Sequence, residues 1–164
     1  KWKKDIYLNK YSIGVEISNK GHGFGYQNYT NKQISSLIKL TKYLIKKYKI
    51  KRSNILGHSD IAYDRKQDPG EKFPWKYLAN KKIGFQHKIN EKKLIKNRKK
   101  KITNRESLKF TIYLNKIGYF TKNFNKKNKF KLVKSFQRRF RQKLVNGKID
   151  RECLIIAEKL SKLF

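Results

Sequence analysis

The sequence predicts an α/β domain followed by a small all-α domain of three helices. Two kinds of hydrophobic periodicity lead to this prediction. Residues 12–17 (SIGVEI) alternate between apolar and other side chains, as in a strand with one buried face. In residues 31–48, and again beyond residue 105, apolar side chains recur at the spacing of amphipathic helices.

The first predicted domain, residues 1–85, carries one further strand and two helices. Its expected elements after the first strand are a helix at 31–48 capped by Thr30, a strand at 53–57, a loop at 59–72 and a helix from 73–75 to about Gly84. The loop contains Asp, Pro and Gly, which favour tight reversals of the chain.

The second predicted domain, residues 106–164, contains three blocks of apolar residues at helical spacing. Asn146 and Gly147 indicate a turn before its last helix. Between the two domains, residues 86–105 are rich in Lys and poor in aliphatic side chains, which is typical of a basic linker.

The chain is strongly basic. Its 164 residues include 44 Lys and Arg but only 11 Asp and Glu, which gives a formal net charge of +33 at pH 7. Such a surface attracts polyanions, and the attraction weakens as salt is added. The charge reflects either selection for an anionic partner or drift in an AT-rich coding sequence, since 36 of the 44 cations are Lys. No apolar stretch approaches the ~20 residues of a membrane-spanning helix.

A candidate site lies around the second expected strand. His58 ends that strand, and the reversal at Pro69 and Gly70 can aim the Asp68 carboxylate back toward it. An imidazole and a carboxylate that converge to about 3–4 Å suit a Zn²⁺ site. Lys66 can stabilise negative charge on a substrate oxygen. The alternative is that His58 is an ordinary surface or core histidine.

Glu16 is a second candidate, on the open face of the first expected strand. Gly14 beside it leaves room for another group to approach. The alternative is a solvent-exposed carboxylate paired with one of the many lysines.

Two blocks of this chain resemble the zinc-dependent N-acetylmuramoyl-L-alanine amidases of the AmpD/AmiD kind. The resemblance covers about residues 1–85 and rests on residues 12–17 followed by residues 57–75 (GHSDIAYDRKQDPGEKFPW). The C-terminal part resembles the peptidoglycan-binding three-helix domain fused to some of these enzymes. That second resemblance rests on LNKIGY at 114–119, SFQRRF at 135–140 and NGKID at 146–150.

The resemblance implies a mixed sheet flanked by helices and a role for each candidate residue. His58 and Asp68 match zinc ligands, Glu16 matches the acid that activates the attacking water, and Lys66 matches the cation beside the scissile carbonyl. His22, in a glycine-rich loop, either lines the substrate rim or is a solvated loop residue. The family's remaining zinc ligand is a histidine upstream of residue 12, which this sequence begins too late to contain. We therefore expect an N-terminally truncated chain that is inactive alone.

The implied activity is hydrolysis of the amide between N-acetylmuramic acid and L-alanine in bacterial cell-wall turnover. The implied cofactor is zinc and the implied partner is peptidoglycan or its muropeptides, with a monomeric protein in the periplasm or cell envelope, or alternatively in the cytoplasm. No nucleic-acid partner is expected. Two other functions remain open: a module that recognises peptidoglycan without cutting it, and a basic nucleic-acid-binding protein.

Overall fold

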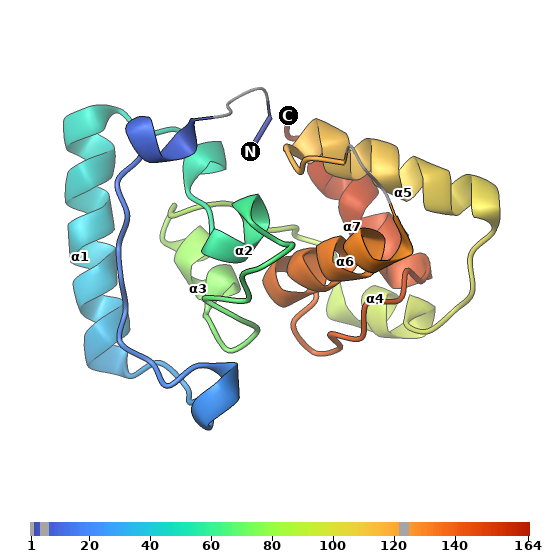
Figure 1. Ribbon diagram of the computed structural model, residues 1–164, viewed down its shortest axis with the longest axis horizontal. Helices are drawn as coiled ribbons and strands as arrows, with labels where there is room; N and C mark the ends of the chain where they lie inside the picture. Colours follow the sequence, from blue (N-terminus) through green and yellow to red (C-terminus); the bar gives the residue numbers. More distant parts are fainter. Residues whose placement is uncertain (1, 4–6, 122–124) are drawn as a thin grey trace.

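The structure, a computed structural model, describes residues 2–3, 7–121 and 125–164 (Figure 1). Three short 3-10 helices and seven α-helices make up its regular structure over these residues. In chain order they are η1 (Leu8–Lys10), η2 (His22–Phe24), α1 (Asn31–Tyr48), η3 (Arg52–Asn54), α2 (His58–Ile61), α3 (Trp75–Asn80), α4 (Glu91–Asn97), α5 (Asn104–Ile117), α6 (Lys126–Phe140) and α7 (Arg151–Ser161). No helix in the described ranges has the length and apolar character that crossing a membrane requires.

The expected α/β architecture, with its mixed sheet, is wrong. Over the described residues no strand forms, and the single β-bridge joins Trp2 to Tyr119. Residues 12–17 run without regular structure, and Ile13 and Val15 are exposed. Alternation of side chains only favours a strand; the strand itself needs a second backbone to exchange hydrogen bonds with. The described part of the chain offers residues 12–17 no such neighbour.

The strand expected at 53–57 is also absent. Its first residues belong to η3, and the chain turns directly into α2 at His58. Arg52 fixes this turn, because its guanidinium donates to the carbonyl oxygens of Gly84 (2.9 Å) and Ala79 (3.0 Å). His58 therefore begins a helical turn rather than ending a strand.

The helix expected at 31–48 is confirmed as α1. Thr30 and Gln33 form a capping box, in which each side chain accepts a hydrogen bond from the other residue's backbone amide. Lys49 ends the helix in the left-handed conformation. The apolar face of α1 contributes to a first core, which contains Ile34, Phe73, Trp75, Leu78 and Ile83. Figure 1 shows α1 at one edge of the molecule, with the chain between η1 and η2, which we call the extended segment, running beside it.

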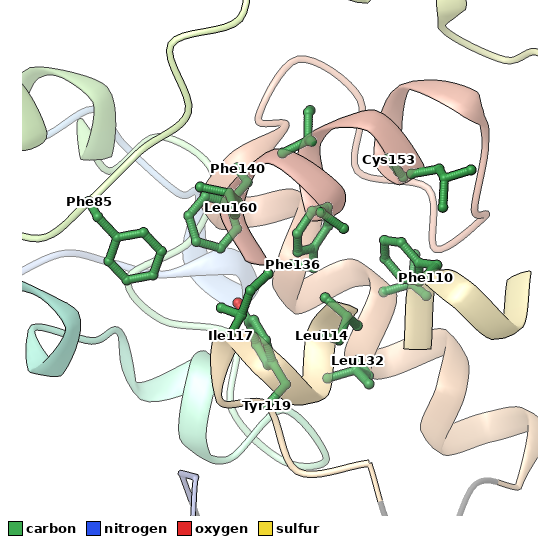
Figure 2. Close-up of a cluster of buried hydrophobic side chains, with 14 of the residues drawn as sticks. Phe85, Phe110, Leu114, Ile117, Tyr119, Leu132, Phe136, Phe140, Cys153 and Leu160 are labelled. Carbon is green, nitrogen blue, oxygen red and sulfur yellow. The ribbon is translucent and has the colours of Figure 1, made fainter. Parts of the chain in front are cut away.

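The three helices expected after residue 105 are present as α5, α6 and α7. We call residues 104–161 the C-terminal unit. It encloses a second, larger core, in which the side chains of Leu132, Phe136 and Leu160 are completely buried (Figure 2). Leu94 of α4 is buried in the same core, so the lysine-rich segment 86–105 contains a packed helix. The division into domains at these boundaries stays a prediction.

Arg139 of α6 joins the two cores. Its guanidinium carbon lies 4.2 Å from the ring centroid of Trp75 in the first core, and 4.8 Å and 5.2 Å from those of Phe85 and Phe140 in the second. Stacking of a guanidinium on aromatic rings is favourable and tolerates burial of the cation. The two parts of the chain therefore meet through a charged side chain that is only 2% exposed.

Trp2 anchors the beginning of the chain to the C-terminal unit. Its ring packs edge-on against Tyr119, with 5.0 Å between the centroids. Gly118 makes this contact possible, because a Cβ at its position would lie 2.6 Å from Cε2 of the tryptophan. The chain there has a φ of 129°, which also favours glycine.

Candidate metal centre

The candidate site is built on residues 57–71, which we call the site loop. Gly57 precedes α2, and its amide donates to the carboxylate of Asp60 (2.8 Å). Farther along, the amide of Ser59 donates to the carbonyl oxygen of Asp68 (2.9 Å). The first hydrogen bond fixes the turn at the beginning of the loop, and the second brings the beginning and the end of the loop side by side.

His58 and Asp68 meet at the mouth of the site loop. Nδ1 of His58 lies 3.1 Å from Oδ2 of Asp68, as the sequence predicts, while 41% and 60% of these side chains remain exposed. Ligands about 2.0–2.2 Å from a tetrahedral zinc ion are roughly 3.4 Å apart. The two donors therefore fit two positions of such a site. Among the described residues, no group of three or more His, Cys, Asp or Glu side chains could hold a metal ion.

Glu16 and Lys66, the predicted base and cation, are both exposed. Glu16 lies on the extended segment before η2, and its carboxylate makes no hydrogen bond or ion pair with any described residue. Lys66 is held through its backbone, whose amide donates to the carbonyl oxygen of Ala62 (2.8 Å). Their side chains are accessible, and their catalytic roles stay predictions.

His22 lies against the far end of the site loop. Its Nε2 is 3.0 Å from the carboxylate of Glu71, and its ring stacks on Tyr26 with 4.4 Å between the centroids. Arg138 of α6 approaches the same carboxylate at 3.6 Å. His22 is thus held beside the turn that follows Asp68. Its contact with substrate stays a prediction.

Two tyrosines that the sequence reasoning did not single out support this turn. The hydroxyls of Tyr26 and Tyr29 both donate to the carbonyl oxygen of Pro69, at 2.7 Å and 2.8 Å. Burial raises the pKa of each phenol, which keeps both in the donating form. Gly70 has a φ of 80°, and a Cβ there would lie 2.5 Å from the Tyr26 hydroxyl. The Gly- and aromatic-rich composition of residues 21–26 is the sequence signal for this contact.

Asp60 is a further structural support of the site loop that sequence reasoning missed. It is only 1% exposed, and both of its carboxylate oxygens are occupied: Tyr119 donates to Oδ1 (2.6 Å), while Gly57 and Arg139 donate to Oδ2. Although it lies two residues after His58, it faces the interior. Asp60 supports the site loop from behind and is not an available metal ligand.

Comparison with known proteins finds a family match in the N-terminal part of the chain. Residues 2–71 match the N-acetylmuramoyl-L-alanine amidase family, and this range contains His22, His58, Asp68 and the site loop. The N-terminal part of the chain is therefore similar in sequence to amidases of this family.

Individual relatives extend the sequence similarity beyond residue 71. The chain is 34% identical to N-acetylmuramoyl-L-alanine amidase AmiD of Escherichia coli over 97% of its own length. It is 43% identical over 67 residues to the 1,6-anhydro-N-acetylmuramyl-L-alanine amidase AmpD of Enterobacter cloacae, which covers 41% of this chain and 34% of that protein.

Solved structures extend the similarity to three dimensions. Escherichia coli AmiD, in complex with the substrate anhydro-N-acetylmuramic acid-L-Ala-D-gamma-Glu-L-Lys, matches 99% of this chain with a TM-score of 0.84 and 31% identity. AmpDh3 of Pseudomonas aeruginosa matches the same share with a TM-score of 0.84 and 28% identity. The chain spans 60% of the AmiD sequence and 66% of each solved chain.

Proposed function

We propose that the protein containing this chain is a zinc-dependent amidase that hydrolyses the bond between N-acetylmuramic acid and L-alanine in peptidoglycan or muropeptides. The observation that carries the proposal is the 3.1 Å approach of His58 to Asp68, in a chain similar to AmiD over 97% of its length. An exposed imidazole–carboxylate pair at a loop mouth is suited to bind a metal ion that a large substrate can reach.

Each residue of the site has a proposed task. His58 and Asp68 would hold the metal. Zinc, when bound, polarises carbonyl oxygens and lowers the pKa of a bound water to about 7. Glu16 takes a proton from the attacking water and delivers it to the leaving amine nitrogen. Lys66 stabilises the negative charge that develops on the substrate's carbonyl oxygen.

Zinc in catalytic sites has three protein ligands, and the described residues bring only two together. We therefore expect residues 1–164 alone to bind zinc weakly and to hydrolyse little. The same observation favours a second candidate function, in which the protein recognises peptidoglycan without cutting it.

The test is hydrolysis of a purified muropeptide by the complete protein, followed by mass spectrometry. We expect release of the stem peptide as a free amine, loss of activity with a chelator and recovery with zinc. Asp68→Asn is expected to abolish both zinc retention and hydrolysis. Asp64→Asn is the matched control, because Asp64 is an exposed carboxylate of the same loop whose partner is Arg65. Binding to cell-wall sacculi without any product, with zinc present, would instead support the recognition function.

A further inference from the structure

The site loop is held largely by α6, a helix of the C-terminal unit. Figure 1 shows α2 and the loop that follows it lying against this helix. The resemblance of the C-terminal unit to peptidoglycan-binding domains suggests a role in wall binding only. The contacts between α6 and the site loop indicate a second role.

The first anchor is Asp60, two residues after His58. Arg139 donates from Nη1 to its carboxylate and from Nη2 to the carbonyl oxygen of Ile55 (2.8 Å). Tyr119 donates to the other carboxylate oxygen. All three residues are buried, with exposed fractions of 2% for Arg139 and 1% for both Asp60 and Tyr119. The C-terminal unit therefore fixes the backbone on which His58 stands.

The second anchor consists of two side chains of α6, Ser135 and Arg138, which bind the two ends of the site loop. The hydroxyl of Ser135 donates to the carbonyl oxygen of Ser59 (2.7 Å), and the amide of Ser59 donates to the carbonyl oxygen of Asp68. Arg138 donates to the side chain of Gln67, the residue before Asp68, at 2.8 Å. One helix thus contacts the chain next to both candidate ligands.

We infer that Arg139, with Ser135 and Arg138, positions the candidate metal ligands, so that the C-terminal unit is a structural part of the site. This inference rests on the proposed function, because that function is what makes His58 and Asp68 metal ligands. The side chains of His58 and Asp68 are too exposed to be fixed by packing, so their separation is set by the backbone behind them. Mutation of groups that hydrogen-bond to metal ligands commonly changes metal affinity by about 10–100-fold. Arg139 acts one step farther away, through Asp60, so we expect an effect at the lower end of this range.

The test compares Arg139→Met with Arg141→Met in the complete protein. Arg141 is a matched control, because it is equally buried but pairs with Asp150 (2.5 Å) and Glu152 (3.5 Å) inside the C-terminal unit. We expect Arg139→Met to weaken zinc binding, measured by competition with a chelator, by about tenfold or more. Arg141→Met should retain the wild-type zinc affinity.

A double variant covers the case in which Arg139→Met does not fold. Removing one partner of a buried ion pair leaves an uncompensated charge, whereas removing both charges is much better tolerated. Arg139→Met combined with Asp60→Asn lacks this charge and also lacks the anchor. It should show the same loss of zinc affinity.

Amide hydrogen exchange at Ser59 provides a readout that needs neither metal nor activity. In metal-free protein we expect this amide to exchange at least about tenfold faster in Arg139→Met than in Arg141→Met, because its bond to Asp68 depends on the anchored loop. Equal zinc affinity and equal Ser59 exchange in the two variants would overturn the inference. If the exchange rates differ but the wild-type protein cleaves no muropeptide, the positioning role stands and the proposed function fails.

Discussion

Glu16 combines an accessible carboxylate with the absence of any ion-pair partner among the described residues. We predict that Glu16→Gln in the complete protein lowers kcat for muropeptide hydrolysis by about 10²–10⁴-fold, since an amide cannot accept the proton that a general base removes. Zinc content should not change. Glu158→Gln, which alters an exposed carboxylate on α7 paired with Lys162, is the control. A wild-type rate for Glu16→Gln would exclude it as the base.

Glu71 gives the site a dependence on pH. Burial alone would raise the pKa of its carboxyl group, but the hydrogen bond with His22 and the charge of Arg138 outweigh burial and lower it. A carboxyl group with a lowered pKa stabilises the fold above its ordinary value near 4.5, and this contribution is lost as the pH falls through the folded-state value.

We therefore predict that Glu71→Gln flattens the fall in melting temperature as the pH drops below about 4.5, where this carboxyl group becomes protonated. At pH 7 the variant should melt below the wild type, because the contacts to His22 and Arg138 are weakened. Asp64→Asn serves as the control, since its carboxylate is exposed and, among the described residues, is paired with the neighbouring exposed Arg65. Parallel melting curves for Glu71→Gln and the wild type would contradict the assignment.

Contacts between residues close in the sequence could be predicted at this site, whereas contacts between distant residues could not. The approach of His58 to Asp68 was within reach of sequence reasoning, because the two residues are only ten positions apart. The turn that joins them is formed at residues 62–66, where the amides of Arg65 and Lys66 donate to the carbonyl oxygen of Ala62, and not at Pro69 and Gly70. The partners of Asp60 could not, since Tyr119 and Arg139 lie 59 and 79 residues away along the chain. Such pairings depend on how the helices pack, and no short sequence pattern encodes them.

At the level of elements, the capping box of α1 is a local device with a measurable effect. We predict that Thr30→Ala lowers the free energy of unfolding by about 1 kcal/mol, because the amide of Gln33 loses its acceptor. Urea denaturation would measure the change. Thr41→Ala, within the same helix, is the control and should be neutral or slightly stabilising, since Ala has the higher helix propensity. Equal losses in the two variants would argue against capping.

Helices were easier to predict than strands for the same physical reason. The hydrogen bonds of α1 connect residues four apart, so its bounds follow from periodicity and a cap. A strand needs a second strand beside it, which can come from a distant part of the sequence. The alternation at 12–17 gives no information about such a partner, and none of the described residues pairs with this segment. The lysine content of 86–105 likewise concealed α4, whose Leu94 is buried in the second core and whose C-terminal neighbour Arg98 pairs with Glu152.

At the scale of the whole molecule, the net charge of +33 acts on every partner. We predict that binding of the complete protein to purified sacculi, measured by co-sedimentation, weakens steadily from about 0.1 M to about 1 M salt, as the screening length falls from about 10 Å to about 3 Å. A matched assay with RNA reports nonspecific attraction. Retention on sacculi at high salt, with RNA released, would show recognition that does not depend on charge.

The placement of the two tryptophans has a practical consequence. The chain contains only Trp2 and Trp75, and each is buried in a different core. Replacing either one with Phe leaves a single fluorophore that monitors one half of the molecule. The emission of the two variants during denaturation therefore reports separately on the two halves, and coincident curves would mean that they melt as one cooperative body.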